Sequence, residues 1–192
     1  SCFQHKDTTT HEHADSSIET HSKIDSTSLL KPSNGIRSIL EDRMGNFWFG
    51  STEWTCFFDG TSYTYFTEED GLCFKDSRIQ EDKNGIIWIQ SGKNLARFNG
   101  EKFSFFVLDQ NISSDTWDVA EDDLWFHRGM ERDENWIGKP GAYRLRDGEF
   151  NYLNFPVAST ENNDQLYLVS SGPKIGKDGT LWFGSMEALI GY

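Results

Sequence analysis

The chain has 192 residues, 15% of them aromatic, and its formal net charge at neutral pH is −13. So acidic a surface repels phosphate backbones, which argues against nucleic-acid binding. The sequence contains no apolar run as long as a membrane-spanning helix needs. The length is sufficient for a domain with a buried core.

Residues 1–34 have few apolar side chains and are rich in Ser, Thr, His, Asp and Glu. This composition predicts a disordered tether, because it buries too little apolar surface to offset the entropy of ordering. Near its start, Cys2 follows the small residue Ser1, and this arrangement resembles the acylation site of bacterial lipoproteins. The resemblance implies a lipid on Cys2 that holds the protein at a membrane surface; the alternative is an unmodified thiol in a tail.

Four histidines also lie in this segment: His5, His11, His13 and His21. Two of them, separated by one residue, could bind a metal ion weakly. A specific metal site needs fixed geometry and supporting partners, which a disordered segment lacks. We therefore expect no metal, and the sequence indicates no other cofactor.

The stretch Ile39–Phe66 occurs again, ungapped and 40 positions later, as Ile79–Phe106. A period of this length is typical of repeat architectures. Two later and less regular copies of the repeat follow. We expect the repeat to be maintained by the matched positions of all four copies: Asp42, Gly45, Trp48, Asp82, Gly85, Trp88, Trp125, Gly179 and Trp182.

Each repeat contains short aromatic and β-branched runs separated by glycine turns. Asp59-Gly60 and Asn99-Gly100 are typical of type I′ hairpins. One repeat therefore predicts about four antiparallel strands, the size of one β-propeller blade. We expect an all-β propeller domain over residues 35–192, with three and a half to four blades of an incomplete ring near 36–67, 76–107, 117–156 and 168–192.

The pattern E-D-x-x-G-x-x-W-[FI]-G, followed by F-[DN]-G-x-x-[FY]-x-x-F, resembles the two-component regulator propeller repeat of periplasmic sensors and surface lipoproteins of Bacteroidetes-type bacteria. The resemblance covers roughly residues 36–192 and is strongest in the first two repeats. It implies an exported, periplasmic or outer-membrane protein that senses or binds a ligand, without catalysis, and that signals through a partner protein. Trp54 departs from the repeat, which usually has Gly-Leu nearby.

The third repeat contains an insertion. Trp125 lies 23 positions before Gly148, whereas Trp48 lies 12 positions before Gly60, so about 11 residues are added within 127–139. Insertions in repeat proteins extend loops on one face, often the binding face. The side chains that could bind a carboxylate, a sugar or a partner protein are His127, Arg128, Arg132 and Trp136; the alternative is a charged surface loop.

Tyr192 lies 10 positions after Trp182, so we expect the fourth repeat to be incomplete and the chain to be part of a longer protein, or to pair with another copy. We expect the four repeat tryptophans to pack between blades. The acidic pairs that recur once per repeat, at 41–42, 81–82 and 121–122, are better explained by turn structure than by catalysis.

Two other functions stay open. Propellers also host lyases and glycoside hydrolases, which would need ionisable groups converging at one mouth. A pure interaction scaffold would instead have no small-molecule site. Cys56 and Cys73 are expected to be buried thiols, although a disulfide is conceivable in an oxidising compartment.

Overall fold

The computed structural model describes residues 13–17, 23–25, 35–73, 77–108, 113–114, 118–127, 141–154, 169–185 and 189–191. They form β-strands, turns and a single short 3-10 helix, η1 (Glu68–Asp70), so the predicted all-β propeller fold is confirmed. None of these residues belongs to a helix long and apolar enough to cross a membrane. The chain divides into two compact units, Ser1–Val107 and Leu108–Tyr192.

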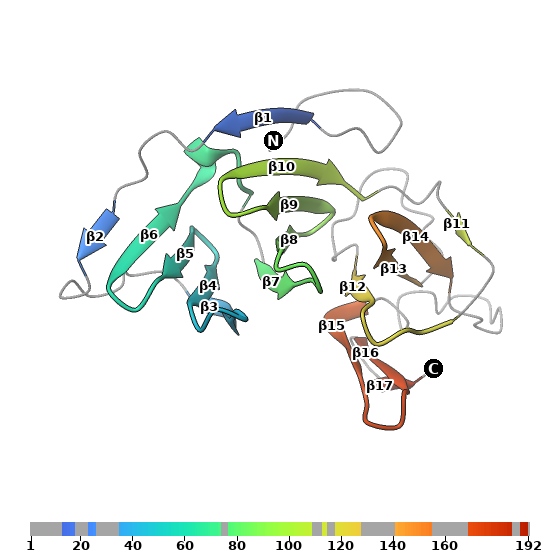
Figure 1. Cartoon of the computed structure of the whole chain (residues 1–192). Helices are drawn as coiled ribbons and strands as arrows, with labels where there is room; N and C mark the ends of the chain where they lie inside the picture. Colours follow the sequence, from blue (N-terminus) through green and yellow to red (C-terminus); the bar gives the residue numbers. More distant parts are fainter. Residues whose placement is uncertain are drawn as a thin grey trace. The chain divides into compact units, whose positions relative to one another are not determined.

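The first unit contains two antiparallel sheets of five strands each (Figure 1). The first sheet has the order β2-β6-β5-β4-β3 and the second the order β1-β10-β9-β8-β7. The strands of the first sheet are β2 (Lys23–Asp25), β3 (Ile36–Glu41), β4 (Phe47–Ser51), β5 (Thr55–Phe58) and β6 (Ser62–Phe66); those of the second are β1 (His13–Ser17), β7 (Arg78–Glu81), β8 (Ile87–Ser91), β9 (Asn94–Phe98) and β10 (Lys102–Val107).

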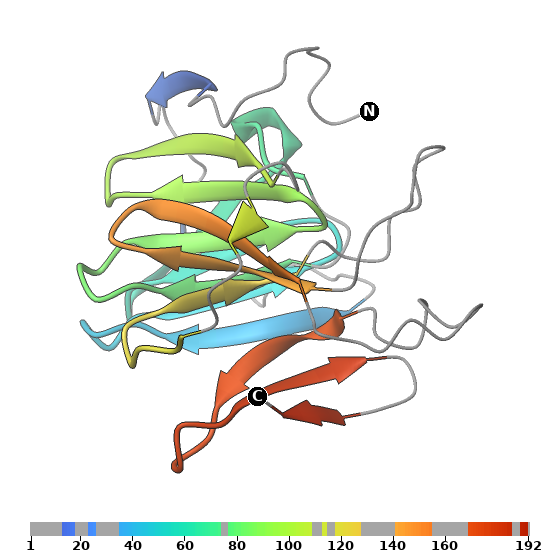
Figure 2. The same cartoon turned by 90° about the vertical axis from the view of Figure 1, so that its right-hand side faces the viewer.

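The second unit contains two further sheets, ordered β11-β14-β13-β12 and β15-β16-β17. The last of these is drawn in red in Figure 2. The strands of the third sheet are β11 (Ser113–Ser114), β12 (Leu124–Phe126), β13 (Gly141–Arg146) and β14 (Glu149–Asn154); those of the fourth are β15 (Val169–Ile175), β16 (Leu181–Ser185) and β17 (Leu189–Gly191).

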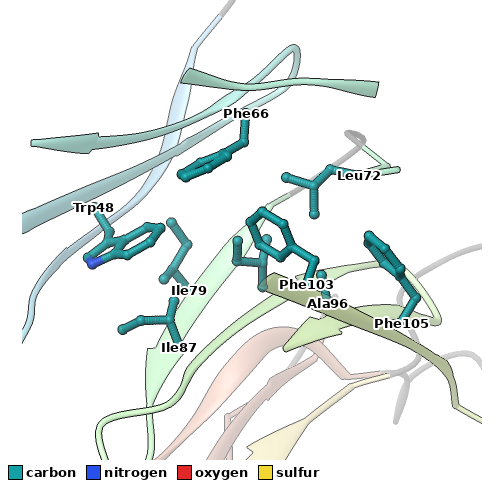
Figure 3. Packing of buried hydrophobic residues seen from close by; sticks show 9 residues of the cluster. Trp48, Phe66, Leu72, Ile79, Ile87, Ala96, Phe103 and Phe105 are labelled. Carbon is teal, nitrogen blue, oxygen red and sulfur yellow. The ribbon is translucent and has the colours of Figure 1, made fainter. Parts of the chain in front are cut away.

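The two sheets of the first unit pack face to face through an aromatic and aliphatic core. Trp48 and Phe66 of the first sheet point toward Ile79, Ile87 and Phe103 of the second (Figure 3). The ring centroids of Phe66 and Phe103 are 5.1 Å apart, at an interplanar angle of 84°. Burial of each large side chain contributes about 1.5–3 kcal/mol, so this core accounts for Trp48 of the first repeat and Ile79 of the second.

The hairpin turns differ from the predicted type I′ geometry in the first two repeats. Gly60 and Gly100 have positive φ, but the preceding Asp59 and Asn99 do not, and three residues separate the strands in each hairpin. The Asp59 carboxylate accepts hydrogen bonds from the amides two and three positions later. The side chain therefore closes the turn, and a second positive φ is not needed. Asp147 (φ 50°) and Gly148 (φ 86°) of the third sheet do form the two-residue I′-like turn.

Two strands lie in the segment that composition predicts to be disordered. β1 pairs antiparallel with β10, and β2 pairs antiparallel with β6. Each thus adds a fifth strand to the outer edge of a repeat sheet. Edge strands offer unpaired backbone N–H and C=O groups to any extended segment, whatever its side chains, and composition does not detect such pairing. Residues 13–17 and 23–25 of this segment thus lie in strands, and the rest of 1–34 lies outside the described residues.

Candidate functional site

The turn between β3 and β4 is built around the carboxylate of Asp42. This group accepts hydrogen bonds from the backbone amides of Met44 and Asn46, both at 2.9 Å. It also accepts from the Asn46 side chain at 3.1 Å and from Nε1 of the buried Trp48 at 3.1 Å. The acidic residue thus closes the turn and orients the tryptophan that enters the core.

The pKa of Asp42 reflects these contacts. Burial alone would raise the pKa of this carboxyl group, but the hydrogen bonds from Asn46, Trp48 and Met44 favour the charged form more strongly. The pKa therefore lies below its usual value. Asp42 is charged at neutral pH and is occupied by structural donors, which does not suit a general acid.

The second repeat reproduces this turn. Asp82 accepts from the amides of Asn84 and Ile86 at 2.8 and 3.0 Å, and from Nε1 of Trp88 at 3.2 Å. Gly85 has the same φ, 82°, as Gly45 of the first repeat. These contacts give Asp82 the same local role as Asp42.

The fourth sheet keeps the backbone turn and changes the side chain that closes it. Gly176 occupies the Asp position, and Gly179 again has a φ of 82°. Asp178 accepts from the amide of Thr180 at 3.0 Å, and this hydrogen bond lowers the pKa of Asp178. Trp182 is 39% exposed, unlike the other repeat tryptophans.

Arg43 links the turns of the first two repeats. Its Nε lies 2.7 Å from Oε1 of Glu81, and its Nη1 donates to the carbonyl oxygen of Lys83 at 2.8 Å. Nη2 donates to the carbonyl oxygen of Asp82. The side chain is 46% exposed, so this clamp is a surface feature that fixes one turn against the next.

The third sheet has an ionic network in the segment before β12, where the first two sheets have the strands β3 and β7. Asp118, in the segment before β12, pairs with both Arg144 and Arg146 of β13. The Arg146 guanidinium also forms two hydrogen bonds with the fully buried Asp123, at 2.6 and 2.7 Å. The network therefore ties residues 118–123 to β13, an interior strand of the sheet.

The network shifts the pKa values of two of its members. Hydrogen bonds from Arg146 and Arg144 lower the pKa of Asp118, and hydrogen bonds to Asp123 and Asp118 raise the pKa of Arg146. Asp123, and not the predicted pair at 121–122, closes the local turn by accepting from the amide of Ala120 at 2.8 Å. The carboxylates of Asp118 and Asp123 pair with the guanidinium groups of Arg144 and Arg146. This pairing favours a structural role for all four residues.

The insertion joins the end of β12 to the start of β13. His127 directly follows β12 and is 4% exposed. At the other end of the insertion, a Cβ on Gly141 would lie 2.3 Å from the Leu153 carbonyl oxygen and 2.8 Å from the Tyr152 ring, so only glycine fits. Both stems of the insertion are thus held in the sheet. Of the predicted binding residues, the structure places His127, while Arg128, Arg132 and Trp136 lie outside the described residues.

Cys56 and Cys73 are both buried and both remain thiols. Cys73 lines a small cavity beside β8 and β9 that offers water about 10 Å³, roughly the room of a single water molecule. This cavity is too small for a ligand. Cys2 lies outside the described residues, and the described part of the chain brings no three His, Cys, Asp or Glu side chains together as a metal site would require.

Comparisons with known proteins agree with the repeat pattern. The profile of the family described as "Two component regulator propeller" matches residues 31–53. The extracellular domain of a putative hybrid two-component system from B. thetaiotaomicron is similar in structure, with a TM-score of 0.56 and 16% identity; the match covers 86% of this chain and 22% of that one. No curated protein matches the sequence.

A second solved structure has the same fold. It is a catalytically inactive virginiamycin B lyase from Staphylococcus aureus, crystallised with quinupristin. Its TM-score is 0.53 at 16% identity, over 84% of this chain and 57% of that one. Since the chain spans little more than half of one of these proteins and less than a quarter of the other, the two structures establish the fold and no activity.

Proposed function

Because the chain carries the two-component regulator propeller repeat, we propose that it is a sensing or binding domain of an exported signalling protein. In this proposal the domain catalyses no reaction, binds an extracytoplasmic ligand or partner protein, and passes the signal to a partner protein. The family match and the structural similarity to an extracellular domain of a two-component system support the proposal.

We place the proposed binding site on the insertion between β12 and β13. The corresponding connections of the first two repeats are tight turns, from Ser51 to Thr55 and from Ser91 to Asn94. The inserted segment adds two arginines and a tryptophan, a combination that suits a carboxylate or an acidic sugar. Buried His127 and the closely packed Gly141 give the segment fixed stems.

Calorimetry with two defined sugars tests this site. We expect tetragalacturonate, which carries carboxylates, to bind the wild-type chain and maltotetraose, which is neutral, to bind at least tenfold more weakly. Arg132→Ala should weaken tetragalacturonate binding about tenfold, as expected for loss of a charge-assisted hydrogen bond. Arg37→Ala is the matched control, since Arg37 is an exposed arginine on the first sheet.

Two results would count against the site. One is failure of both sugars to bind, and the other is an equal effect of Arg132→Ala and Arg37→Ala. Trp136→Ala separates the two proposed contributions, because loss of stacking should weaken both sugars while loss of the arginine should weaken only the acidic one.

We also propose that Cys2 carries a lipid. Expression of the native gene in bacteria fed tritiated palmitate should label the wild-type protein and not a Cys2→Ser variant. Equal labelling of both proteins would refute acylation at this residue. The sugar-binding test uses the unmodified chain, so its outcome does not depend on the lipid.

A further inference from the structure

The outermost repeat strand of each sheet in the first unit carries an added strand along its edge. β1 pairs antiparallel with β10, and β2 pairs antiparallel with β6 (Figure 1). Each of these outer edges lies at the end of the repeat strands within its own sheet. An outer edge is therefore a permanent feature of the repeat, and its existence does not depend on how many sheets precede or follow.

β10 is held in place by contacts that do not involve β1. Five consecutive residues of β10 pair with β9 on its other side. Phe103 and Phe105 are buried in the core of the first unit, and Phe106 packs against Trp88 with ring centroids 5.7 Å apart. The edge would therefore keep its shape if β1 left, and the backbone N–H and C=O groups that face outward would become available for pairing.

The added strands have no sequence pattern in common. β1 has the sequence HADSS and β2 has the sequence KID, and both occupy the same kind of edge. In the second unit, the strand β11 pairs with the outer strand β14 in the parallel direction. These edges therefore recognise the backbone of an extended segment more than its side chains, which is the basis of binding by β-strand addition.

β1 is an imperfect occupant of the β10 edge. Between His13 and Ser16, β1 advances three residues while β10 advances two, so β1 contains a bulge that interrupts the ladder. The described partners of β1 end at Phe105, whereas β10 continues to Val107. A longer segment without a bulge would form a longer and more regular ladder, and it could therefore displace β1.

We infer that the outer edge of β10 binds an extended segment of a partner protein, and that β1 is the chain's own competitor for this edge. Because β1 belongs to the same chain, its effective concentration at the edge is high. The affinity for the partner segment is therefore reduced by the fraction of molecules in which β1 is bound. The net charge of −13 favours a basic segment over an acidic one. This inference does not depend on the proposed sugar site, which lies on the insertion.

Fluorescence anisotropy of a labelled peptide, Lys-Thr-Val-Thr-Val-Thr-Lys, tests the inference on the full chain. A second peptide has the same side chains but carries methyl groups on the backbone nitrogens of its central residues, so these residues cannot donate hydrogen bonds to a strand edge. A third peptide has glutamate in place of both lysines. The comparison separates backbone pairing from the effect of charge.

A variant with β1 locked in place combines Ser17→Cys and Lys102→Cys in a Cys2→Ser background. Ser17 and Lys102 are direct Cα partners in the antiparallel pair, a geometry that suits a disulfide between two cysteines. Oxidation should therefore fix β1 on β10, and reduction of the same protein should release it. The other two cysteines of the chain are buried thiols.

A variant with β1 released combines Ser16→Pro and Ser17→Pro. Backbone N–H groups alternate in direction along a strand, so one of these neighbouring residues directs its N–H group toward β10, and proline removes it. Thr8→Pro with Thr9→Pro is the matched control, because it places the same prolines before β1. Circular dichroism checks that every variant keeps the fold.

We expect the released variant to bind the basic peptide at least about tenfold more tightly than wild type and the proline control do. The oxidised locked variant should not bind it, and reduction should restore the affinity. The methylated peptide should not bind any variant, and the acidic peptide should bind more weakly than the basic one. The inference fails if the released variant binds no peptide, if oxidation leaves binding unchanged, or if the methylated peptide binds equally well. It also fails if the released variant sediments as a dimer and binds no peptide, since its edges would then pair with each other.

Discussion

Replacing Asp42 by alanine removes the acceptor around which the first repeat turn is built. Four donors lose their partner: the amides of Met44 and Asn46, the Asn46 side chain and Nε1 of Trp48. Water replaces the acceptor for the exposed amides, whereas Trp48 is 2% exposed and its N–H stays unsatisfied. At about 0.5–1 kcal/mol for each bond, the free energy of unfolding should fall by roughly 2–4 kcal/mol.

Two further variants separate charge from geometry. Asp42→Asn keeps one oxygen for the turn amides and turns an NH₂ group toward the indole N–H, so we expect an intermediate loss of about 1–2 kcal/mol. Asp178→Ala is the control from the fourth sheet, because the Asp178 carboxylate accepts a hydrogen bond from the amide of Thr180 and from no tryptophan. It should cost at most about 1 kcal/mol.

The effect should also depend on pH. The pKa of Asp42 is lowered in the folded chain, so its charged form contributes stability above the unfolded pKa of about 4. That contribution is lost as the pH falls through the folded pKa. The difference in unfolding free energy between wild type and Asp42→Ala should therefore be constant from pH 7 to pH 5 and should shrink below about pH 4.

Urea denaturation followed by tryptophan fluorescence measures these differences. Two results would refute the role given to Asp42: a loss below about 0.5 kcal/mol for the alanine variant, or a difference that grows on acidification. The latter would mean that the charged carboxylate destabilises the turn.

Four further changes test other parts of the fold by the same denaturation assay. Gly45→Ala should lower the free energy of unfolding by about 1–2 kcal/mol from positive φ alone, since its Cβ meets nothing within 4 Å. Gly50→Ala should lower the free energy of unfolding more, because its Cβ would lie 2.6 and 2.7 Å from neighbouring oxygens. An equal loss for the two variants would contradict this reasoning. Arg43→Ala should cost about 1 kcal/mol at low salt and less at 1 M salt, and an effect independent of salt would exclude the ionic clamp. Asp123→Ala should cost about 3–5 kcal/mol by leaving Arg146 with one partner fewer in a partly buried site, and a loss below 1 kcal/mol would contradict the network.

The repeat positions were predictable because their chemistry is local. Gly45 adopts positive φ in a tight turn, and Trp48 follows on an alternating strand, so sequence spacing fixes both turn and core. Trp182 follows the same pattern and is nevertheless exposed. A repeat motif specifies which face a side chain occupies, but whether another sheet covers that face depends on the neighbours.

Other features escaped prediction for physical reasons. β1 and β2 join their sheets through backbone pairing at strand edges, which leaves little trace in composition. Asp123 lies one position after the expected acidic pair and accepts a hydrogen bond from the amide of Ala120. A signal for its network was present: Arg144 and Arg146 are two apart on a strand and share a face. The role of Trp54 is not visible in the sequence, because its contact with Tyr65 joins β6 to the turn before β5.

The pairing of β1 with β10 sets how far the domain can stand from an anchor. His13 is already opposite Phe105 in the second sheet, so a lipid on Cys2 would be joined to the folded domain by the residues between Cys2 and His13 alone. At about 3.5 Å per residue, their full extension is roughly 40 Å, against about 110 Å for a tether that ran to residue 34. The outer edge of the second sheet would then stay within about one domain diameter of the membrane, where a partner embedded in that membrane could reach it directly.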